Sequence, residues 1–270
     1  PRIQAAVALR DRRDRLAAGL TIVVGGRECR RAIGTRVGVE VAFVCTPLLR
    51  SEDALAASAT LRARGADVIE VSERAFAKLA FGDRADGLVM VVRTPPTELR
   101  DLHVGEEPLV LVTEDVEKPG NVGAILRTAD AAGCDAVIAI GGTDLFNPNV
   151  IRASIGTAFT VPLAAATAEA ALAWLRSSGI RIVAARVDAE RLYSDADLTG
   201  PLAFALGSEA RGLSDAWTAP DIETVRLPML GVADSLNLSV SAAVLLYEAR
   251  RQRGLPHGRQ PTHPKPDGDP

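Results

Sequence analysis

Short apolar runs of strand-forming residues alternate with helical stretches along most of this 270-residue chain. Such alternation is typical of α/β folds, in which helices cover both faces of a mostly parallel sheet. The predicted strands lie in TIVVGG, VEVAFVCT, ADVIEVS, GLVMVVR, LVLVTEDV, AVIAIGG, VPLAAAT, RIVAARVD, PLAFALGSE and TVRLPML. We therefore predict an α/β protein, and a hydrophobic content of 47% supplies the apolar side chains for its core.

The alternation is interrupted once, which predicts two domains. Residues 1–93 form a small α/β domain, and residues 94–107, rich in proline and charge, form a linker. Residues 108–255 form a second domain with a mostly parallel sheet, and the polar, proline-rich residues 256–270 form a disordered tail. Because ligands of such sheets bind beyond the carboxyl ends of the strands, we expect a functional site in the loops there.

Composition argues against several classes of protein. The three cysteines are far apart with no C-x-x-C pair, and the three histidines lie in the predicted linker and tail. This pattern speaks against a disulfide framework, a metal site and histidine-based catalysis. No apolar run reaches the ~18 residues of a membrane span and no signal peptide is recognisable. We therefore expect a cytoplasmic protein with no metal and no membrane partner.

Positive charge is concentrated near the N-terminus, although the net charge is −3. Between Arg2 and Arg36, nine arginines stand against three acidic residues. Two interpretations fit this stretch equally well. It forms either a solvated helix surface or a surface that contacts the phosphates of a nucleic acid.

A glycine-containing turn, EKPGNVGAILRTADAAG at residues 117–133, follows a predicted strand and opens a helix. Gly120 and Gly123 lack the spacing of dinucleotide-binding and P-loop motifs, so a nucleotide-dependent oxidoreductase is not favoured. The apolar residues of the helix form one stripe, and Arg127 projects from the other side together with small residues such as Gly123. We predict that a ligand can approach the helix closely on that side and meet Arg127.

The last predicted helix, in SLNLSVSAAVLLYEARRQRG, is apolar almost all round between Val240 and Tyr247. A helix of this kind is buried on more than one side. We expect it to pack on its own sheet and against a second subunit.

Three loops of the second domain carry polar residues at what should be one edge of the sheet. They contain Asn121 and Arg127, then Glu209 in GSEARGLS, then Ser235 and Asn237 in LPMLGVADSLNLS. Taken singly, each residue is explained by helix capping or by surface charge.

In these loops the chain resembles the SpoU-type branch of the SPOUT superfamily, S-adenosylmethionine-dependent RNA ribose 2′-O-methyltransferases. The family motif N-x-G-x-x-x-R is matched by residues 121–127 and G-[SA]-E-x-x-G by residues 207–212. The third motif, [IL]-P-M followed by S-L-N-[VL]-S, is matched by residues 227–229 and 235–239. The resemblance covers essentially all of the second domain, and the first domain is more weakly similar to the family's RNA-binding domain, which resembles a ribosomal protein.

The resemblance implies a trefoil-knotted catalytic domain, a homodimer whose sites join two subunits, and S-adenosylmethionine as cofactor without a metal. The implied cofactor-binding residues are Gly207, Leu227, Met229, Leu236 and Leu238. The implied catalytic residues are Asn121, Arg127, Glu209, Ser235 and Asn237, and the residues expected to bind RNA are Arg30, Arg31 and Arg152.

Within this resemblance, Arg127 is expected to stabilise the negative charge that develops on the ribose oxygen, because a guanidinium is hard to deprotonate. Glu209 is expected to orient Arg127 or its equivalent in the partner subunit. Asn121 and Asn237 would fix the ribose, and Ser235 would lie between the cofactor and the hydroxyl.

The implied substrate is RNA and not DNA. Large-subunit (23S) ribosomal RNA is favoured because family members with such an N-terminal domain often act on it, and some of them confer antibiotic resistance. The alternatives are a tRNA ribose methyltransferase, a base methyltransferase of the same superfamily, and a non-catalytic RNA-binding module.

Overall fold

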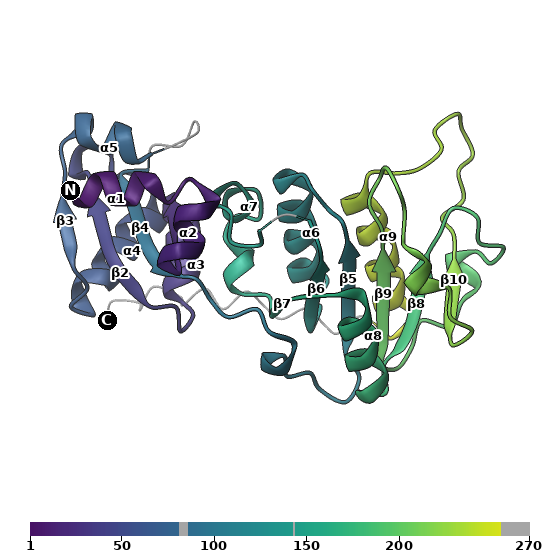
Figure 1. Ribbon diagram of the computed structural model, residues 1–270. Helices are drawn as coiled ribbons and strands as arrows, with labels where there is room; N and C mark the ends of the chain where they lie inside the picture. Colours follow the sequence, from purple (N-terminus) through teal and green to yellow (C-terminus); the bar gives the residue numbers. More distant parts are fainter. Residues whose placement is uncertain (81–85, 143, 255–270) are drawn as a thin grey trace, which may run out of the picture.

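The computed structural model describes residues 1–80, 86–142 and 144–254, so the predicted tail lies outside the described residues. It contains two sheets, one in each half of an elongated molecule (Figure 1). The first sheet has the order β1-β4-β2-β3, with β4 antiparallel to β1 and β2, and β2 parallel to β3. Its strands are β1 (Leu20–Val24), β2 (Val39–Val44), β3 (Val68–Glu70) and β4 (Leu88–Arg93). Its helices are α1 (Arg2–Ala8), α2 (Arg12–Ala18), α3 (Gly26–Ile33), α4 (Glu52–Ala63) and α5 (Glu73–Leu79).

The second sheet has six strands in the order β10-β8-β9-β5-β6-β7, and every pairing is parallel. The prediction of a mostly parallel sheet is therefore confirmed. Its strands are β5 (Leu109–Glu114), β6 (Ala136–Ile140), β7 (Leu163–Ala166), β8 (Arg181–Ala185), β9 (Leu202–Leu206) and β10 (Ile222–Val225). Its helices are α6 (Pro119–Ala131), α7 (Pro148–Ala153), α8 (Ala168–Ser177) and α9 (Leu238–Gln252).

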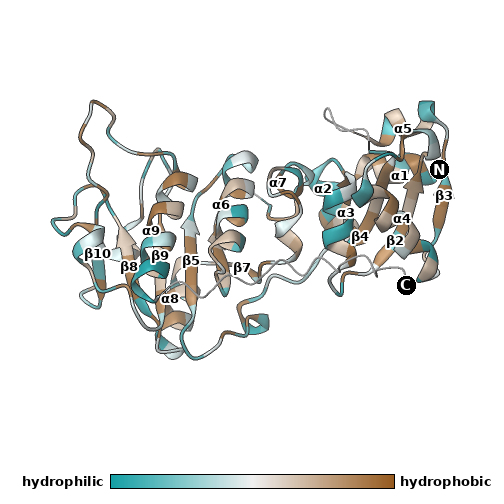
Figure 2. Ribbon diagram, turned by 180° about the vertical axis from the view of Figure 1, so that it is seen from behind, coloured by the Kyte–Doolittle hydropathy of each residue, from teal (hydrophilic) through white to brown (hydrophobic). Residues whose placement is uncertain are grey.

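Both faces of the second sheet are covered. Leu109 and Leu111 of the central strand β5 belong to the buried cluster that includes α6 and α9, whereas Val110 and Val112 belong to the cluster that includes α8. Figure 2 shows brown, apolar colour along the central strand β5, whereas the helices carry both brown and teal residues. This explains why the strands are continuous apolar runs in the sequence. Within the described ranges, no helix is long and apolar enough to cross a membrane.

The alternation of strands and helices also predicts one helix through NVIRASIGTAF, residues 149–159, and this prediction is wrong. The helix α7 ends at Ala153, and Ile155 and Gly156 then adopt positive φ angles of 55° and 79°. Gly156 is required there by close packing, because a Cβ atom at this position would lie 2.9 Å from the Cα of Glu28 in the first half of the molecule. Contact between the two halves therefore breaks the helix.

The segment predicted as a linker packs on the second sheet. Thr97 accepts a backbone hydrogen bond of 2.8 Å from Ala165 in β7, and Leu102 is buried. Residues 97–104 thus contribute to the second half of the molecule and do more than connect the two halves.

The two halves are joined by a shared core and by buried polar contacts. Val23 and Cys29 of the first half belong to the same apolar cluster as Phe146 and Phe159 of the second, and α7 lies between the first sheet and α6 (Figure 1). Arg15, buried in α2, donates to the Oδ2 atom of Asp144 at 2.7 Å. Further bonds run from Thr21 Oγ1 to the Phe146 carbonyl and from Arg31 Nη1 to the Ile155 carbonyl.

Substitution of Arg15 by alanine should lower the free energy of unfolding by about 2 kcal/mol. Removal of one partner of a buried ion pair leaves the other charge uncompensated, and part of that penalty is relieved because Asp144 is 17% exposed. Urea denaturation measures the loss. The matched control is Arg176→Ala, which removes an exposed pair with Asp221 and should change stability by less than about 1 kcal/mol. Equal effects of both substitutions would contradict the assigned importance of the Arg15 contact.

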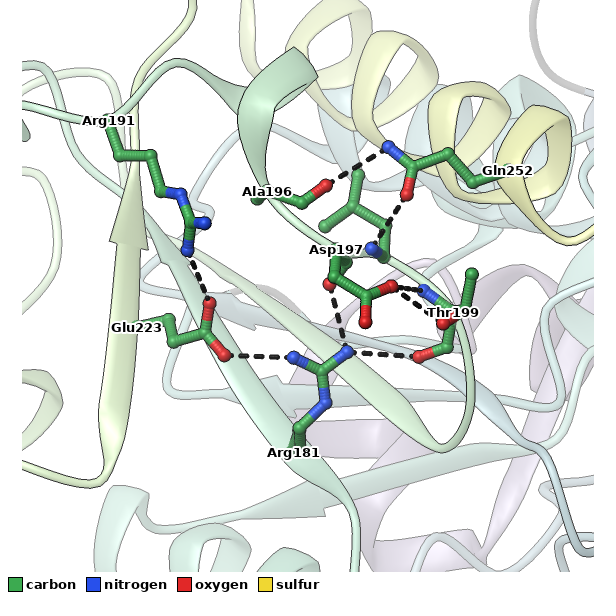
Figure 3. Close-up of polar contacts among 8 residues, drawn as sticks. Arg181, Arg191, Ala196, Asp197, Thr199, Glu223 and Gln252 are labelled. Carbon is green, nitrogen blue, oxygen red and sulfur yellow. Dashed lines mark hydrogen bonds and ion pairs between the residues drawn. The ribbon is translucent and has the colours of Figure 1, made fainter.

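The connection between β8 and β9, residues 186–201, is held by polar side chains on both of its flanks (Figure 3). Arg181 in β8 donates to Glu223 in β10 and to the carbonyls of Asp197 and Thr199. Gln252 in α9 accepts from the Leu198 amide at 2.8 Å and donates to the Ala196 carbonyl at 3.1 Å. The connection therefore lies against the C-terminal helix.

Candidate functional site

A cavity of about 470 Å³ lies at the carboxyl ends of β8, β9 and β10. Its lining residues come from four segments of chain, within residues 185–188, 206–213, 225–229 and 234–241. Each of the first three follows directly from the end of a strand in the parallel sheet. This is the edge at which a parallel sheet binds ligands, as the sequence predicted.

A tight backbone turn forms one wall of the cavity. The Gly212 amide donates to the Ser208 carbonyl at 2.9 Å, and Gly212 adopts a φ of 67°. A Cβ atom on Gly207 would lie 2.0 Å from the carbonyl carbon of Gly212, so only glycine fits. The turn therefore brings main-chain amides and carbonyls to the cavity surface without intervening side chains.

All five residues predicted to bind the cofactor line this cavity. Gly207 belongs to the turn, Leu227 and Met229 follow β10, and Leu236 and Leu238 lie at the start of α9. A mostly apolar wall with accessible main-chain groups fits a ligand that has apolar parts and is recognised through the backbone. The contacts with a cofactor remain a prediction.

Three of the predicted catalytic residues form one hydrogen-bonded cluster beside the cavity. Glu209 Oε1 accepts from Asn237 Nδ2 at 2.8 Å, from Asn121 Nδ2 at 3.2 Å and from the Leu238 amide at 3.4 Å. Asn237 also caps α9 by accepting from the Ser239 amide at 3.0 Å. The carboxylate of Glu209 therefore fixes the start of α6 relative to the start of α9.

A second, smaller cavity of about 130 Å³ lies beside the same loop. It shares residues 208–211 and Leu238 with the larger cavity and adds Asp115 to Lys118 together with Asn121. The loop of residues 208–212 therefore lies between two adjoining hollows.

Ser235 and Arg127 occupy different places. Ser235 is exposed and lines the larger cavity. Arg127 is exposed on α6, lines neither cavity, and forms no hydrogen bond or ion pair with the described residues. Because Glu209 bonds to Asn121 and Asn237, it does not orient Arg127 of its own chain. Contact between Glu209 and an arginine of a second subunit stays a prediction.

The expectation that Gly123 clears a path for a ligand is wrong. Gly123 is buried, and a Cβ atom there would lie 2.4 Å from the Cβ of Ala153 in α7. The small residue allows α6 to pack closely on α7. The sequence pattern could not distinguish close helix packing from close approach of a ligand.

The three predicted RNA-binding arginines lie apart from the cavities. Arg30 forms an ion pair with Asp53 at 2.8 Å, and Arg31 donates to the Ile155 carbonyl at the joint between the two halves. Arg152 is half-buried in α7. Their contacts with RNA stay predictions, and the structure adds a structural role for Arg31.

Three acidic and basic residues near the loop were missed by sequence reasoning. Glu114, buried at the end of β5, accepts from the Ser214 amide at 2.7 Å and from its hydroxyl at 2.8 Å. Asp115 follows it with a positive φ of 54°, and its Oδ2 accepts from Arg211 Nη2 at 3.1 Å. The signal was the acidic pair directly after the apolar run LVLVT, which is unusual at a buried strand end.

Residues that could hold a metal ion do not come together here. In the described part of the chain there is no group of three or more His, Cys, Asp or Glu side chains arranged to bind one. The polar groups at and beside the cavity are amides, hydroxyls, carboxylates and guanidinium groups, which suit hydrogen bonding to a polar substrate.

Comparison with known families matches both halves of the chain. Residues 108–247 match the SpoU rRNA Methylase family, and residues 1–90 match the MRM3-like substrate binding domain. The 23S rRNA (guanosine-2′-O-)-methyltransferase RlmB of Ralstonia nicotianae is 35% identical over 76% of this chain and 84% of its own length. The 23S rRNA (uridine(2479)-2′-O)-methyltransferase of Streptomyces viridochromogenes is also 35% identical, over 62% of this chain. This chain spans 60% of the length of that relative.

Solved structures extend the similarity to nearly the whole chain. The SpoU methyltransferase AviRb from Streptomyces viridochromogenes, in complex with AdoMet, is 30% identical with a TM-score of 0.84, covering 93% of this chain and 97% of that one. A crystal structure of an RNA 2′-O ribose methyltransferase is 41% identical with a TM-score of 0.82, covering 93% and 96%.

Proposed function

The chain belongs to the SpoU rRNA methylase family, and from that premise we propose that it methylates the ribose 2′-hydroxyl of one nucleotide in 23S ribosomal RNA, with S-adenosylmethionine as donor. The observation that carries the proposal is the larger cavity, whose wall contains all five predicted cofactor-binding residues and adjoins the cluster of Asn121, Glu209 and Asn237. A similar chain has been solved with AdoMet bound, which supports the choice of cofactor.

The chain's own groups fit this cofactor. The backbone of the turn at Gly207 would hold its polar parts, and Leu227, Met229 and Leu238 would pack against its apolar surface. When bound, the cofactor supplies an electrophilic methyl group on a positively charged sulfur. Leu236 and Ser235 also line the cavity, and Ser235 would lie between the cofactor and the substrate hydroxyl.

Catalysis requires stabilisation of the ribose oxygen as it loses its proton. We assign this task to Arg127, because a fixed cation at a developing anion lowers the barrier and a guanidinium stays protonated. Asn121 and Asn237, held by Glu209, would position the ribose. The developing anion and the positively charged donor neutralise each other, so exclusion of water favours the step without a metal.

The same reasoning supports a homodimer. Val240 and Tyr247 on α9 are apolar or aromatic yet 46% and 48% exposed, which is typical of a surface that a partner covers. Arg127 lines neither cavity of its own chain. We propose that it completes the site of the partner subunit.

The proposal includes the knot of the family. Passage of the chain between β10 and α9 beneath residues 186–201 would form it, and two contacts support this path. Leu192 forms a parallel bridge with Arg226, and Gln252 bonds to both Ala196 and Leu198.

As an enzyme of ribosomal RNA, the protein would act in the cytoplasm. Methylation of a nucleotide within a drug-binding site of the ribosome would confer antibiotic resistance.

The test is transfer of a labelled methyl group from S-adenosylmethionine to total RNA from a host that lacks the modification, followed by mapping of the modified nucleotide. We expect label on a ribose oxygen in 23S rRNA. Label on a base would instead indicate a base methyltransferase of the same superfamily, and label on tRNA alone would indicate a tRNA ribose methyltransferase. RNA binding without any transfer would indicate a non-catalytic module.

A further inference from the structure

The loop of residues 208–212 is where the target nucleotide must lie if the proposed methyl transfer is correct. One of the two adjoining cavities would hold the cofactor, and the other contains Asn121 beside Glu209. A ribose oxygen can reach the methyl group only at the boundary between them. The base attached to that ribose must therefore contact the loop or its neighbours.

A base taken out of an RNA structure needs a flat partner to replace the stacking that it has lost. Proteins supply an aromatic ring or the plane of an arginine guanidinium. No Phe, Tyr or Trp among the described residues lines either cavity. Arg211 lines both, and its side chain is 69% exposed, so its guanidinium plane is accessible.

The guanidinium of Arg211 is held by a carboxylate that is itself fixed. Arg211 Nη2 donates to Asp115 Oδ2 at 3.1 Å. Asp115 has the positive φ of 54°, which is unfavourable for a residue with a side chain, and its amide donates to the Ile140 carbonyl at 2.8 Å. Gly141 leaves room for the carboxylate, because a Cβ atom there would lie 2.4 Å from Asp115 Oδ1. Asp115 thus adopts an unfavourable backbone conformation in which its carboxylate lies beside Arg211.

The charges around Arg211 suit an uncharged base better than a phosphate. The smaller cavity is lined by three carboxylates, at Asp115, Glu117 and Glu209, and by two cations, at Lys118 and Arg211. An additional phosphate would add to this excess of negative charge. Stacking on a guanidinium whose charge is balanced by a carboxylate carries no such cost.

We propose that Arg211 is the stacking platform for the base of the target nucleotide and that Asp115 is the positioning residue that holds it. Every base has a π face, so this contact strengthens binding without selecting one base. The other guanidinium at the larger cavity, that of Arg186, is bound twice by Asp188 and does not line the smaller one. The platform rests on the proposed function, because it requires a nucleotide at this loop.

The experiment compares variants that separate the plane of the side chain from its charge. Steady-state methylation of the mapped RNA should show a KM roughly 10-fold higher for Arg211→Ala, the scale of one lost base stack. Arg211→Tyr keeps a plane without the charge and should restore most of the affinity, whereas Arg211→Lys keeps the charge without the plane and should not. Asp115→Ala should raise KM by less than Arg211→Ala and leave kcat unchanged.

Two measurements test whether the higher KM has a cause other than the loss of stacking. The affinity for S-adenosylmethionine, measured by calorimetry, should be unchanged in each variant, which shows that the loop is intact. The matched control is Arg176→Ala, which removes an exposed, ion-paired arginine at a different place in the same domain and should leave KM unchanged.

Other outcomes overturn the inference. If Arg211→Lys restores the KM for RNA and Arg211→Tyr does not, Arg211 contacts a phosphate. If neither variant restores it, stacking on Arg211 is also excluded. The proposed stacking role is also contradicted if Arg211→Ala leaves KM unchanged, or if it lowers the affinity for S-adenosylmethionine by as much as it raises KM. In all of these cases the wild-type protein still methylates RNA, whereas its failure to do so would overturn the proposed function itself.

Discussion

Replacing Arg127 with alanine is expected to lower turnover by roughly 100-fold or more, the scale observed when one donor that stabilises a developing anion is removed. Fold stability and cofactor affinity should be nearly unchanged, because the side chain is exposed and forms no hydrogen bond or ion pair with the described residues. Single-turnover methylation of the mapped RNA measures the effect on the chemical step. Near wild-type turnover would return Arg127 to the role of a solvated surface residue.

Two comparisons sharpen this result. Arg127→Lys should recover part of the turnover, since the charge remains while the planar fork is lost. Mixed dimers of one Arg127→Ala subunit and one Glu209→Ala subunit should regain one intact site if each site joins Glu209 of one chain with Arg127 of the other. If both residues act within one chain, every site in the mixed dimer is defective, and the shared-site proposal fails.

Substitution of Gly207 by alanine is expected to weaken S-adenosylmethionine binding by roughly 100-fold, because overpacking that costs up to about 3 kcal/mol falls on the turn that walls the cavity. The added Cβ atom would lie 2.0 Å from the Gly212 carbonyl carbon and 2.2 Å from the Leu213 nitrogen. Both are main-chain atoms, so the clash is relieved only by moving the turn. Isothermal calorimetry with S-adenosylmethionine measures the loss.

The matched control is Gly105→Ala in the segment before β5. No atom lies within 4 Å of a Cβ there, and the backbone has no positive φ, so cofactor affinity should be unchanged. A similar loss of affinity in both variants would show that the turn at Gly207 has no special role in the cavity.

The periodic features of the chain could be predicted from its sequence. Each strand of both sheets overlaps an apolar run that predicts it, although β1 begins one residue and β10 two residues before the predicted run, because burial on both faces imposes a local pattern. The placement of Glu209 beside Asn121 and Asn237 came from motif order and from the rule that parallel strands end at one edge. Local pattern and strand direction were sufficient for the strands and for the edge of the sheet, whereas the roles expected of the loop residues came from the resemblance to the family.

Contacts between distant parts of the chain could not be predicted in this way. The break after α7 depends on Gly156 meeting Glu28, and the burial of Gly123 depends on α7, neither of which leaves a periodic signal. The pair of Asp115 and Arg211 joins residues whose loops meet only in the folded sheet. The sequence left Arg15 open as either a solvated or a phosphate-contacting arginine, and only the folded structure places its partner Asp144 beside it.

The joint between the two halves has a geometric consequence for any RNA that touches both. One apolar cluster runs through both sheets, and Arg15, Thr21 and Arg31 all bond across the boundary. Domains packed through such a core do not swing freely about a tether. The first half and the cavity are therefore held at a fixed distance from each other. An RNA bound to the first half would present its nucleotide to the cavity only if its own folded shape spans that distance. Discrimination between RNAs can then depend on three-dimensional distance, with no base being read by the first half at all.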